Sequence, residues 1–337
     1  MANLTTSYLG LNLQSPIVIS SNPLSEDIDS IRQLEEAGAG AIVLFSLFEE
    51  QIEMDELGYS GYYDNHRREL PEALRHVPAM KEYHMGAGGY LAHIYQVKRA
   101  VQMPIIASLN GYYSSGWTRY AKLIEAAGAD ALELNIYYVP TKAHVSGADV
   151  EQMYIDLVRN VRQVVRIPVA VKISSEFSSI ANFSRKLVGA GADALVLFNR
   201  FYQPDIDLDT ETIAPTIELS NPSELRLRLR WVALLAGQLD AQLAITGGVH
   251  SGGDVAKSLL AGANVAMMAS AVLRHGPGYV ATVLNELTDW LEEHGYEDSN
   301  SVRGKLCQLQ TGDTAALERA NYLNIMLSHR SWPDADE

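Results

Sequence analysis

The stretch AGADALELNIYYVP, residues 127–140, opens with a five-residue phrase that recurs along the chain. Variants of the phrase begin at Ala37 (AGAGA), Ala190 (AGADA) and Ala261 (AGANV). Each copy follows a segment with helical periodicity and precedes a run of aliphatic or β-branched residues. The glycine is typical of a helix C-terminus, where a residue without Cβ takes a positive φ. Each copy therefore marks a helix-to-strand connection.

The intervals between these phrases predict the number of strands. A βα unit of a parallel barrel takes roughly 30 residues, so each interval is long enough for two units. The eight predicted strands are residues 17–21, 41–48, 105–111, 131–138, 169–174, 194–201, 243–249 and 265–271. Apolar strands that alternate with amphipathic helices indicate a parallel sheet covered on its outer face. The sequence therefore predicts an α/β fold, a (β/α)₈ TIM barrel.

Three segments are predicted to elaborate this barrel. An N-terminal hairpin precedes the first strand, and residues 296–337 form a C-terminal helical extension. The interval between the first two phrases is the longest, and its excess falls in residues 49–103, which are rich in Tyr, His and charge. Because this insertion follows the second strand, we expect it over the C-terminal mouth of the barrel. The alternative is a helical excursion that only braces its neighbours. Residues 1–337 are predicted to form one domain.

The composition excludes several classes of function. Lys and Arg number 26 against 41 Asp and Glu, a formal charge of −15, and no basic run occurs, which argues against nucleic acid and anionic membranes. The single cysteine, Cys307, excludes a disulfide framework and Cys-based metal or iron–sulfur sites. No His/Asp/Glu spacing is typical of a metal site. Without a leader or an 18-residue apolar run, the chain is expected to be cytoplasmic.

Chemistry in such a barrel takes place where the strands end. The polar or small residues at those ends are Ser20, Ser21, Asn22, Ser46, Ser108, Asn110, Asn135, Tyr137, Tyr138, Lys172, Asn199, Arg200, Thr246, Gly247, Gly248, Ala269 and Ser270. Two glycines after the seventh strand, and a helix start after the eighth at Ala269 and Ser270, expose backbone N–H groups. Together they predict a phosphate site of the barrel type, although paired glycines also occur in ordinary turns.

Lys172 is the only charged residue in the strand segment IPVAVKISS, residues 167–175. A buried lysine needs an anionic or electron-rich partner, unless its side chain extends to the rim. A ligand with a phosphate and an electron-poor ring fits this layout. Flavin mononucleotide (FMN) is such a ligand, with Lys172 near the N1–C2 carbonyl side of the reduced, anionic ring. Alternatively, Lys172 is the Schiff-base lysine of an aldolase or isomerase that uses the phosphate site without flavin.

Several motifs together resemble one known family. These are SPIVISSNP (15–23), PIIASLNG (104–111), AGADALELN (127–135), IPVAVKIS (167–174), ITGGVHSGGDVAKSLLAGANVAMMASAVLRHGP (245–277) and RGKL (303–306). They are similar to the FMN-dependent dihydroorotate dehydrogenases, especially the soluble class 1 members. The resemblance implies FMN as cofactor and a homodimer. It also implies that the flavin is bound by Ser20, Ser21, Ser46, Asn110, Asn135, Lys172, Asn199, Thr246, Gly247, Gly248, Ala269 and Ser270.

The substrate side departs from the family pattern. Class 1 members carry a phrase like LNLSCPN on the fourth strand, in which the Cys is the base and the last Asn holds the pyrimidine. Here the phrase is LNIYYVP, so that Tyr138 takes the position of the base and Pro140 that of the Asn. A family lysine after the second strand is replaced by Phe45, followed by Ser46. The loop that binds orotate is missing, and the Tyr/His-rich insertion stands in its place.

These observations predict an FMN-dependent oxidoreductase acting on a small CH–CH or C=C substrate. Because a phenol has a pKa near 10, it is a poor base at neutral pH but a competent proton donor. Tyr138, with Tyr137 beside it, is the candidate donor; alternatively both tyrosines only shape the pocket. Two other functions stay open. One is a genuine dihydroorotate dehydrogenase with a tyrosine base, and the other is a non-catalytic FMN subunit that docks on a redox partner protein.

Overall fold

The computed structural model describes residues 2–56, 86–112, 116–201, 203–214, 217–308 and 314–328. Eight parallel strands close into a barrel in the order β11-β12-β3-β4-β5-β6-β7-β8. The strands are β3 (Ile17–Ile19), β4 (Ala41–Phe48), β5 (Ile105–Gly111), β6 (Ala131–Ile136), β7 (Val169–Ile173), β8 (Ala194–Leu197), β11 (Gln242–Thr246) and β12 (Val265–Met268). The predicted (β/α)₈ barrel is confirmed, and several strands end earlier than expected.

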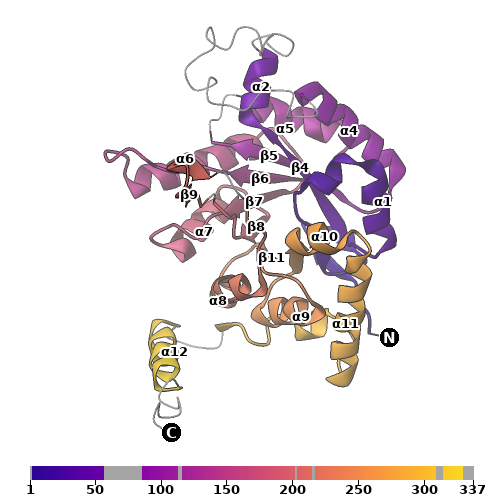
Figure 1. Ribbon diagram of the computed structural model, residues 1–337, viewed down its shortest axis with the longest axis vertical. Helices are drawn as coiled ribbons and strands as arrows, with labels where there is room; N and C mark the ends of the chain where they lie inside the picture. Colours follow the sequence, from indigo (N-terminus) through magenta and orange to yellow (C-terminus); the bar gives the residue numbers. More distant parts are fainter. Residues whose placement is uncertain are drawn as a thin grey trace.

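Helices surround the barrel (Figure 1). They are α1 (Ile28–Glu36), α2 (Glu49–Glu56), α4 (Ala87–Ala100), α5 (Trp117–Ala126), α6 (Gly147–Arg162), α7 (Ile180–Gly189), α8 (Leu225–Leu235), α9 (Gly252–Ala261), α10 (Ser270–His275) and α11 (Tyr279–Glu293). The recurring phrase has the predicted role. Its glycines, Gly38, Gly128, Gly191 and Gly262, take φ values of 98°, 99°, 110° and 115° just after helices. They turn the chain from each helix into the next strand.

The side chains of the strands divide into two cores because they alternate between the two faces of the sheet. Outward residues pack under the helices, whereas small and β-branched residues such as Ala131, Ala170 and Val196 fill the barrel. A hairpin of β1 (Thr6–Tyr8) and β2 (Leu11–Leu13) adds the buried Tyr8 to this interior core. The hairpin therefore closes the N-terminal end of the barrel. The N-terminal hairpin predicted from the sequence is confirmed.

Strand β4 contains a bulge that decides which side chains enter the barrel. Its pairing with β5 advances three residues from Val43 to Ser46 while β5 advances two, from Ile106 to Ser108. The extra residue reverses the alternation of β4. As a result Ser46 Oγ reaches Ser108 Oγ inside the barrel, at 2.8 Å. The ring of Phe45 instead packs outside, against helix α4.

Three segments lie beyond the regular βα units. A small hairpin of β9 (Asp205–Asp207) and β10 (Thr212–Ala214) follows β8 and was not predicted. Helix α12 (Thr314–Ser328) belongs to the predicted C-terminal extension (Figure 1), and its Glu318 forms an ion pair with Arg230 of α8 at 2.6 Å. The predicted insertion includes α2 and α4, and its residues 57–85 lie outside the described residues. Its predicted position over the mouth stays a prediction.

Candidate active site

Most of the predicted cofactor residues converge on one cavity of about 160 Å³ at the C-terminal ends of the strands. Strands β3, β7, β8, β11 and β12 supply Ser20, Ser21, Lys172, Asn199, Thr246, Gly247, Gly248, Ala269 and Ser270 to its lining. Two further predicted residues join it through hydrogen bonds. Asn135 Oδ1 accepts from Asn199 Nδ2 at 2.6 Å, and Ser46 Oγ lies 3.5 Å from Ser21 Oγ.

Gly247 and Gly248 form the turn after β11, with φ values of 90° and 83° that disfavour any residue with a Cβ. Space also requires glycine at both positions. A Cβ on Gly248 would lie 2.4 Å from the backbone nitrogen of Leu225, and one on Gly247 would lie 3.0 Å from Nη2 of Arg228. The glycines therefore let helix α8 pack closely against this turn, which lines the cavity with its backbone.

Arg228 is a buried cation in this cavity that the sequence analysis did not identify as a site residue. It lies on α8 and is 6% exposed. Its Nε donates to Thr246 O at 2.9 Å and its Nη1 to Glu224 O at 2.7 Å. Burial is the main cause that lowers the pKa of this guanidinium, although an arginine stays charged at neutral pH. Arg228 thus adds a fixed positive charge beside the glycine turn.

The helical periodicity of α8 places Arg228 on the buried face of the helix, and this position could have identified it as a site residue. Within the segment LRLRLR, residues 225–230, it shares the buried face of the helix with Leu225 and Val232. Its neighbour Arg226 is exposed. An arginine at a core-facing position needs an internal partner, because an unpaired buried charge is costly. Spacing along the helix, rather than the number of basic residues, separates the two arginines.

A chain of polar groups continues from the glycine turn toward α10. Ser220 Oγ donates to Ser270 Oγ at 2.9 Å, and Gly248 N donates to Ser220 Oγ at 3.4 Å. The Nε2 atom of His250 lies 3.4 Å from the same Ser220 hydroxyl. Burial, followed by the nearby charge of Arg274, lowers the pKa of His250 below its usual value. The imidazole is therefore neutral at pH 7 and can accept or donate a hydrogen bond here.

Lys172 lines the same cavity from β7, and it has an anionic partner. Its Nζ lies 3.6 Å from Oε1 of Glu133, and the two side chains are 9% and 0% exposed. Within the strand pairing, Lys172 lies beside Asn135. The lysine therefore does not extend to the rim of the barrel, and its ammonium remains buried at the cavity.

A second, larger cavity of about 830 Å³ adjoins the first and shares Ser21, Arg200, Ala269 and Ser270 with it. Asn110, a predicted flavin residue, and Tyr137 line this cavity. The Tyr137 ring packs against Phe201 with centroids 4.4 Å apart. The two cavities together give a polar, cationic end and a wider, more aromatic end. This division suits a ligand that carries a phosphate, with a second molecule beside its ring.

The two tyrosines of the fourth strand end take different positions. Tyr137 lines the larger cavity, whereas Tyr138 is absent from the described lining of both cavities. The Tyr138 ring instead packs against Tyr112, with centroids 5.0 Å apart. Strand β6 ends at Ile136, and the backbone N–H of Tyr137 still donates to Gly111 O at the end of β5, at 3.0 Å. This placement puts Tyr137, rather than Tyr138, at the larger cavity, which Tyr112 also lines.

Phe45, at the position of the family lysine, contacts helix α4 rather than the cavities. Its ring meets Tyr90 edge-on at 5.1 Å and lies 5.6 Å from the ring of His93. The bulge in β4 explains this orientation, because it turns Ser46 inward in place of Phe45. On this side of the barrel the departure from the family therefore removes a cation from the mouth without placing a ring there.

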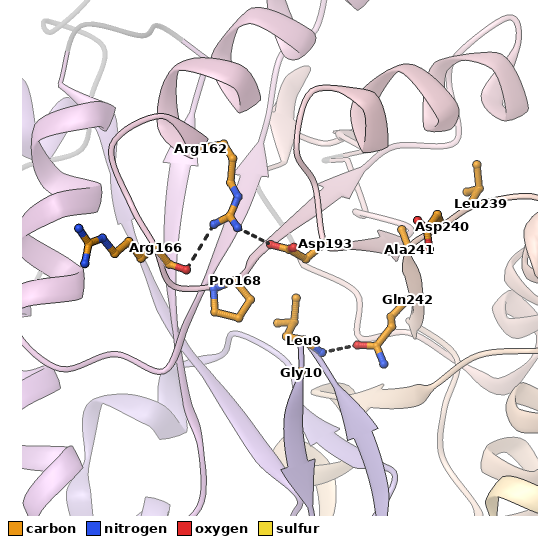
Figure 2. A pocket seen from close by; sticks show the side chains of 10 residues that line it. All are labelled: Leu9, Gly10, Arg162, Arg166, Pro168, Asp193, Leu239, Asp240, Ala241 and Gln242. Atoms are coloured by element: carbon orange, nitrogen blue, oxygen red, sulfur yellow. Dashed lines mark hydrogen bonds and ion pairs between the residues drawn. The ribbon is translucent and has the colours of Figure 1, made fainter.

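A cavity of about 610 Å³ lies at the opposite end of the barrel, beside the β1–β2 turn (Figure 2). Arg162 is held there by the carbonyl of Ile167 at 3.0 Å and by Asp193 at 4.0 Å. The backbone of Leu9 donates to the side chain of Gln242, which also fixes the turn. These contacts join the hairpin and the barrel loops, and the N-terminal end of a barrel carries stability rather than chemistry.

The described residues contain neither a metal-binding cluster nor a membrane-spanning helix. No group of three or more His, Cys, Asp or Glu side chains there could hold a metal ion. None of the helices within the described ranges has the length and apolarity needed to cross a bilayer.

Comparison with known proteins agrees with this geometry. A family model described as dihydroorotate dehydrogenase matches residues 76–291, more than half of the chain. The chain belongs to the dihydroorotate dehydrogenase family. The protein is therefore a dihydroorotate dehydrogenase-like oxidoreductase, and members of this family are flavoproteins. The resemblance seen in the sequence motifs is confirmed.

Curated relatives cover nearly the whole chain at low identity. The catalytic subunit of dihydroorotate dehydrogenase B (NAD(+)) from Thermoplasma volcanium is 24% identical over 90% of this chain and 98% of its own. Its counterpart from Desulforudis audaxviator is 27% identical over 88% of this chain and 94% of its own. The Methanocaldococcus jannaschii protein is 25% identical over 86% and 94%. Such distant relatives share the family, while the substrate contacts are free to differ.

Proposed function

We propose that this protein is an FMN-dependent oxidoreductase that acts on a small CH–CH or C=C substrate. One observation carries the proposal: Lys172, the Gly247–Gly248 turn and Arg228 line a single cavity at the C-terminal ends of the strands. A ligand with a phosphate at one end and an electron-poor ring at the other needs both a phosphate site and a buried ammonium in one cavity. The flavoproteins of this family use such a ligand.

The residues present fit FMN. Gly247, Gly248 and Ser270, with Arg228, would hold the phosphate, because they combine close backbone approach, a hydroxyl and a cation. Lys172 and Asn199 would donate hydrogen bonds to the ring edge. The predicted residues Ser20, Ser21, Ser46, Asn110, Asn135, Thr246 and Ala269 complete the proposed cofactor site. When bound, FMN supplies the hydride chemistry, and the protein residues orient it and exclude water.

On the substrate side we assign the proton to a tyrosine. Tyr137 lines the larger cavity, which supports it as the phenol that donates a proton to the substrate carbon. Tyr138, the residue at the family's base position, packs on Tyr112 and supports the loop in this proposal. The aromatic neighbour Phe201 limits the orientation of Tyr137. Hydride transfer and protonation on the same small substrate then require both cavities.

Assembly is part of the proposal. The relatives are named catalytic subunits, which supports a redox partner protein for this chain as well. We also propose a homodimer, and one catalytic domain over residues 1–337. Residues 49–103 form the insertion that shapes the mouth in this domain, and residues 296–337 form the C-terminal extension.

The test is an anaerobic spectral titration. The purified, FMN-loaded protein is mixed with dihydroorotate and, separately, with dithionite as a general reductant. Bleaching near 450 nm by dithionite but not by dihydroorotate excludes dihydroorotate as the substrate, and anaerobic bleaching by another CH–CH compound from a screen then supports the proposed oxidoreductase. Bleaching by dihydroorotate identifies a genuine dihydroorotate dehydrogenase, the alternative favoured by the names of the relatives. An FMN-loaded protein that turns over no CH–CH or C=C substrate in a screen would refute the enzymatic proposal and leave an electron-transfer subunit.

A further inference from the structure

Glu133, in the middle of β6, is a buried carboxylate that neither cavity exposes. Its side chain is 0% exposed, and within the described residues neither carboxylate oxygen has a hydrogen-bond partner. The nearest charge that faces it is Lys172, whose Nζ lies 3.6 Å from Oε1. A carboxylate without hydrogen bonds in a protein interior is costly, and removing its counterion leaves an uncompensated charge. Such a group calls for an explanation.

The strand register places Glu133 directly beneath the site. Lys172 pairs with Asn135 on β6, while Glu133 pairs with Ala170, two residues earlier on β7. Since residues two apart on a strand share a face, Glu133 lies one layer deeper in the barrel than Lys172. Lys172 lines the cavity and Glu133 does not. Glu133 can therefore act on a ligand only without contact, through its charge and through the lysine that it holds.

Two buried phenols lie near this carboxylate, Tyr8 in the barrel interior and Tyr90 on helix α4 outside it. Burial raises the pKa of Tyr8 and of Tyr90, and the charge of Glu133 adds to the rise in both. The Tyr90 hydroxyl accepts from Ser108 N at 2.9 Å, so it is engaged elsewhere. Both phenols stay neutral at pH 7. In the described part of the barrel, the ammonium of Lys172 is thus the charge that balances Glu133.

We propose that Glu133 is a positioning residue that fixes Lys172 and offsets its charge beneath the flavin. The site then offers the ring a hydrogen-bond donor with little net positive charge. This limits how far the protein stabilises the reduced, anionic ring and any anion bound beside it. The inference rests on the proposed FMN site and deepens it, because it assigns a residue that sets the redox potential without touching the cofactor.

The first test is sulfite titration of the FMN-loaded Glu133→Gln variant at pH 7. Sulfite adds to flavin N5 more tightly when the surroundings favour negative charge on the ring. Removing one negative charge within several ångströms of Lys172 should strengthen sulfite binding by about tenfold or more, which corresponds to a rise of about 30 mV in a two-electron potential. Tyr8→Phe, which alters the same interior without removing a charge, should leave sulfite affinity unchanged. Equal affinities in wild type and Glu133→Gln would overturn the proposal.

A double-mutant cycle separates action through Lys172 from a general effect on packing. In a Lys172→Met background, where no ammonium is left to offset, Glu133→Gln should change sulfite affinity by a smaller factor than it does in the wild-type background. The apoprotein offers a readout without flavin: Lys172→Met alone should lower the unfolding temperature more than the Lys172→Met/Glu133→Gln pair does. Additive effects in both measurements would contradict a coupled pair. If Glu133→Gln does not fold, Glu133→Asp replaces it and should shift sulfite affinity in the same direction by less.

The outcomes distinguish this inference from the function on which it rests. A protein that binds no FMN refutes the proposed function, whereas the unfolding cycle still tests the Glu133–Lys172 pair. An FMN-loaded protein in which Glu133→Gln changes neither sulfite affinity nor the coupling refutes this inference alone.

Discussion

The guanidinium of Arg228 packs directly against Gly247: a Cβ at this glycine would lie 3.0 Å from Nη2. The contact joins helix α8 to the turn after β11, and the arginine also donates to Thr246 O within that turn. A buried cation therefore lies against the glycine turn that lines the cavity. This relationship leads to the first two predictions.

Replacing Arg228 should weaken cofactor binding. The variant Arg228→Gln removes a charged hydrogen-bond donor from the proposed phosphate site, so the dissociation constant for FMN should rise by about 10- to 100-fold. Fluorescence quenching of FMN by the apoprotein measures the constant. Arg226→Gln, on the exposed side of the same helix, is the matched control and should bind FMN as the wild type does. Equal affinities for the two variants would remove Arg228 from the site.

Adding a methyl group at Gly248 should be destabilising. Its φ of 83° is unfavourable for alanine, and the new Cβ would meet the backbone of Leu225 at 2.4 Å. We expect Gly248→Ala to lower the free energy of unfolding by about 1–3 kcal/mol, measured by urea denaturation of the apoprotein. Gly253→Ala provides the comparison, because its Cβ would approach nothing closer than Ser251 Oγ at 3.7 Å. Equal stabilities of the two variants would show that the turn has room to relax.

Substitution of the two tyrosines tests the assignment of the proton donor. Tyr137→Phe should lower kcat by about 10²- to 10⁴-fold on the substrate found, because it removes the phenol proposed as the proton donor at the larger cavity. The loss should be smaller for Tyr138→Phe, whose ring packs on Tyr112. FMN content, measured by absorbance, should stay at the wild-type level in both variants. A larger loss of kcat in Tyr138→Phe than in Tyr137→Phe would identify Tyr138, at the family's base position, as the proton donor.

Protonation of His250 should destabilise the apoprotein in mild acid. Because the folded state lowers the pKa of His250, the unfolded chain binds more protons near that pKa. The stabilisation is complete above the unfolded pKa of about 6.5 and is lost as the pH falls through the lower, folded pKa. Unfolding temperatures measured from pH 7.5 to 5 should decrease less steeply in His250→Gln. A wild-type slope in His250→Gln would exclude this contribution.

The sequence was sufficient to predict the barrel because its signals are local and repeated. A glycine that ends a helix, followed by an apolar strand, occurs at Gly38, Gly128, Gly191 and Gly262, and all four take the positive φ that was expected. The cavity residues followed from the same regularity, since parallel strands must end at one rim. The binding of FMN by these cavity residues stays a prediction.

Other features depend on tertiary detail that a single sequence does not encode locally. A bulge of one residue turned Phe45 outward, and no pattern in β4 indicated it. Beyond the end of β6 at Ile136, the rings of Tyr137 and Tyr138 pack against Phe201 and Tyr112, and no local pattern indicated these contacts. The β9–β10 hairpin is short and exposed, so it has no buried alternation to detect. In these places packing, rather than propensity, decided the outcome.

The pairing of Glu133 with Lys172 beneath the site could not be predicted from the sequence either. The sequence indicated that Lys172 needs a partner, yet Glu133 lies 39 positions earlier on the neighbouring strand, and only the register brings the two together. Partners across a sheet are set by strand pairing, which a single sequence does not reveal.

The central claim is that this barrel binds FMN, and the visible spectrum of the purified protein, combined with the mass of the cofactor released on denaturation, tests it most directly. We predict absorption maxima near 375 and 450 nm and one FMN per chain, either as purified or after the apoprotein is titrated with FMN. A colourless protein that binds no FMN, and that forms a borohydride-trapped adduct at Lys172 with a carbonyl substrate, would contradict the account.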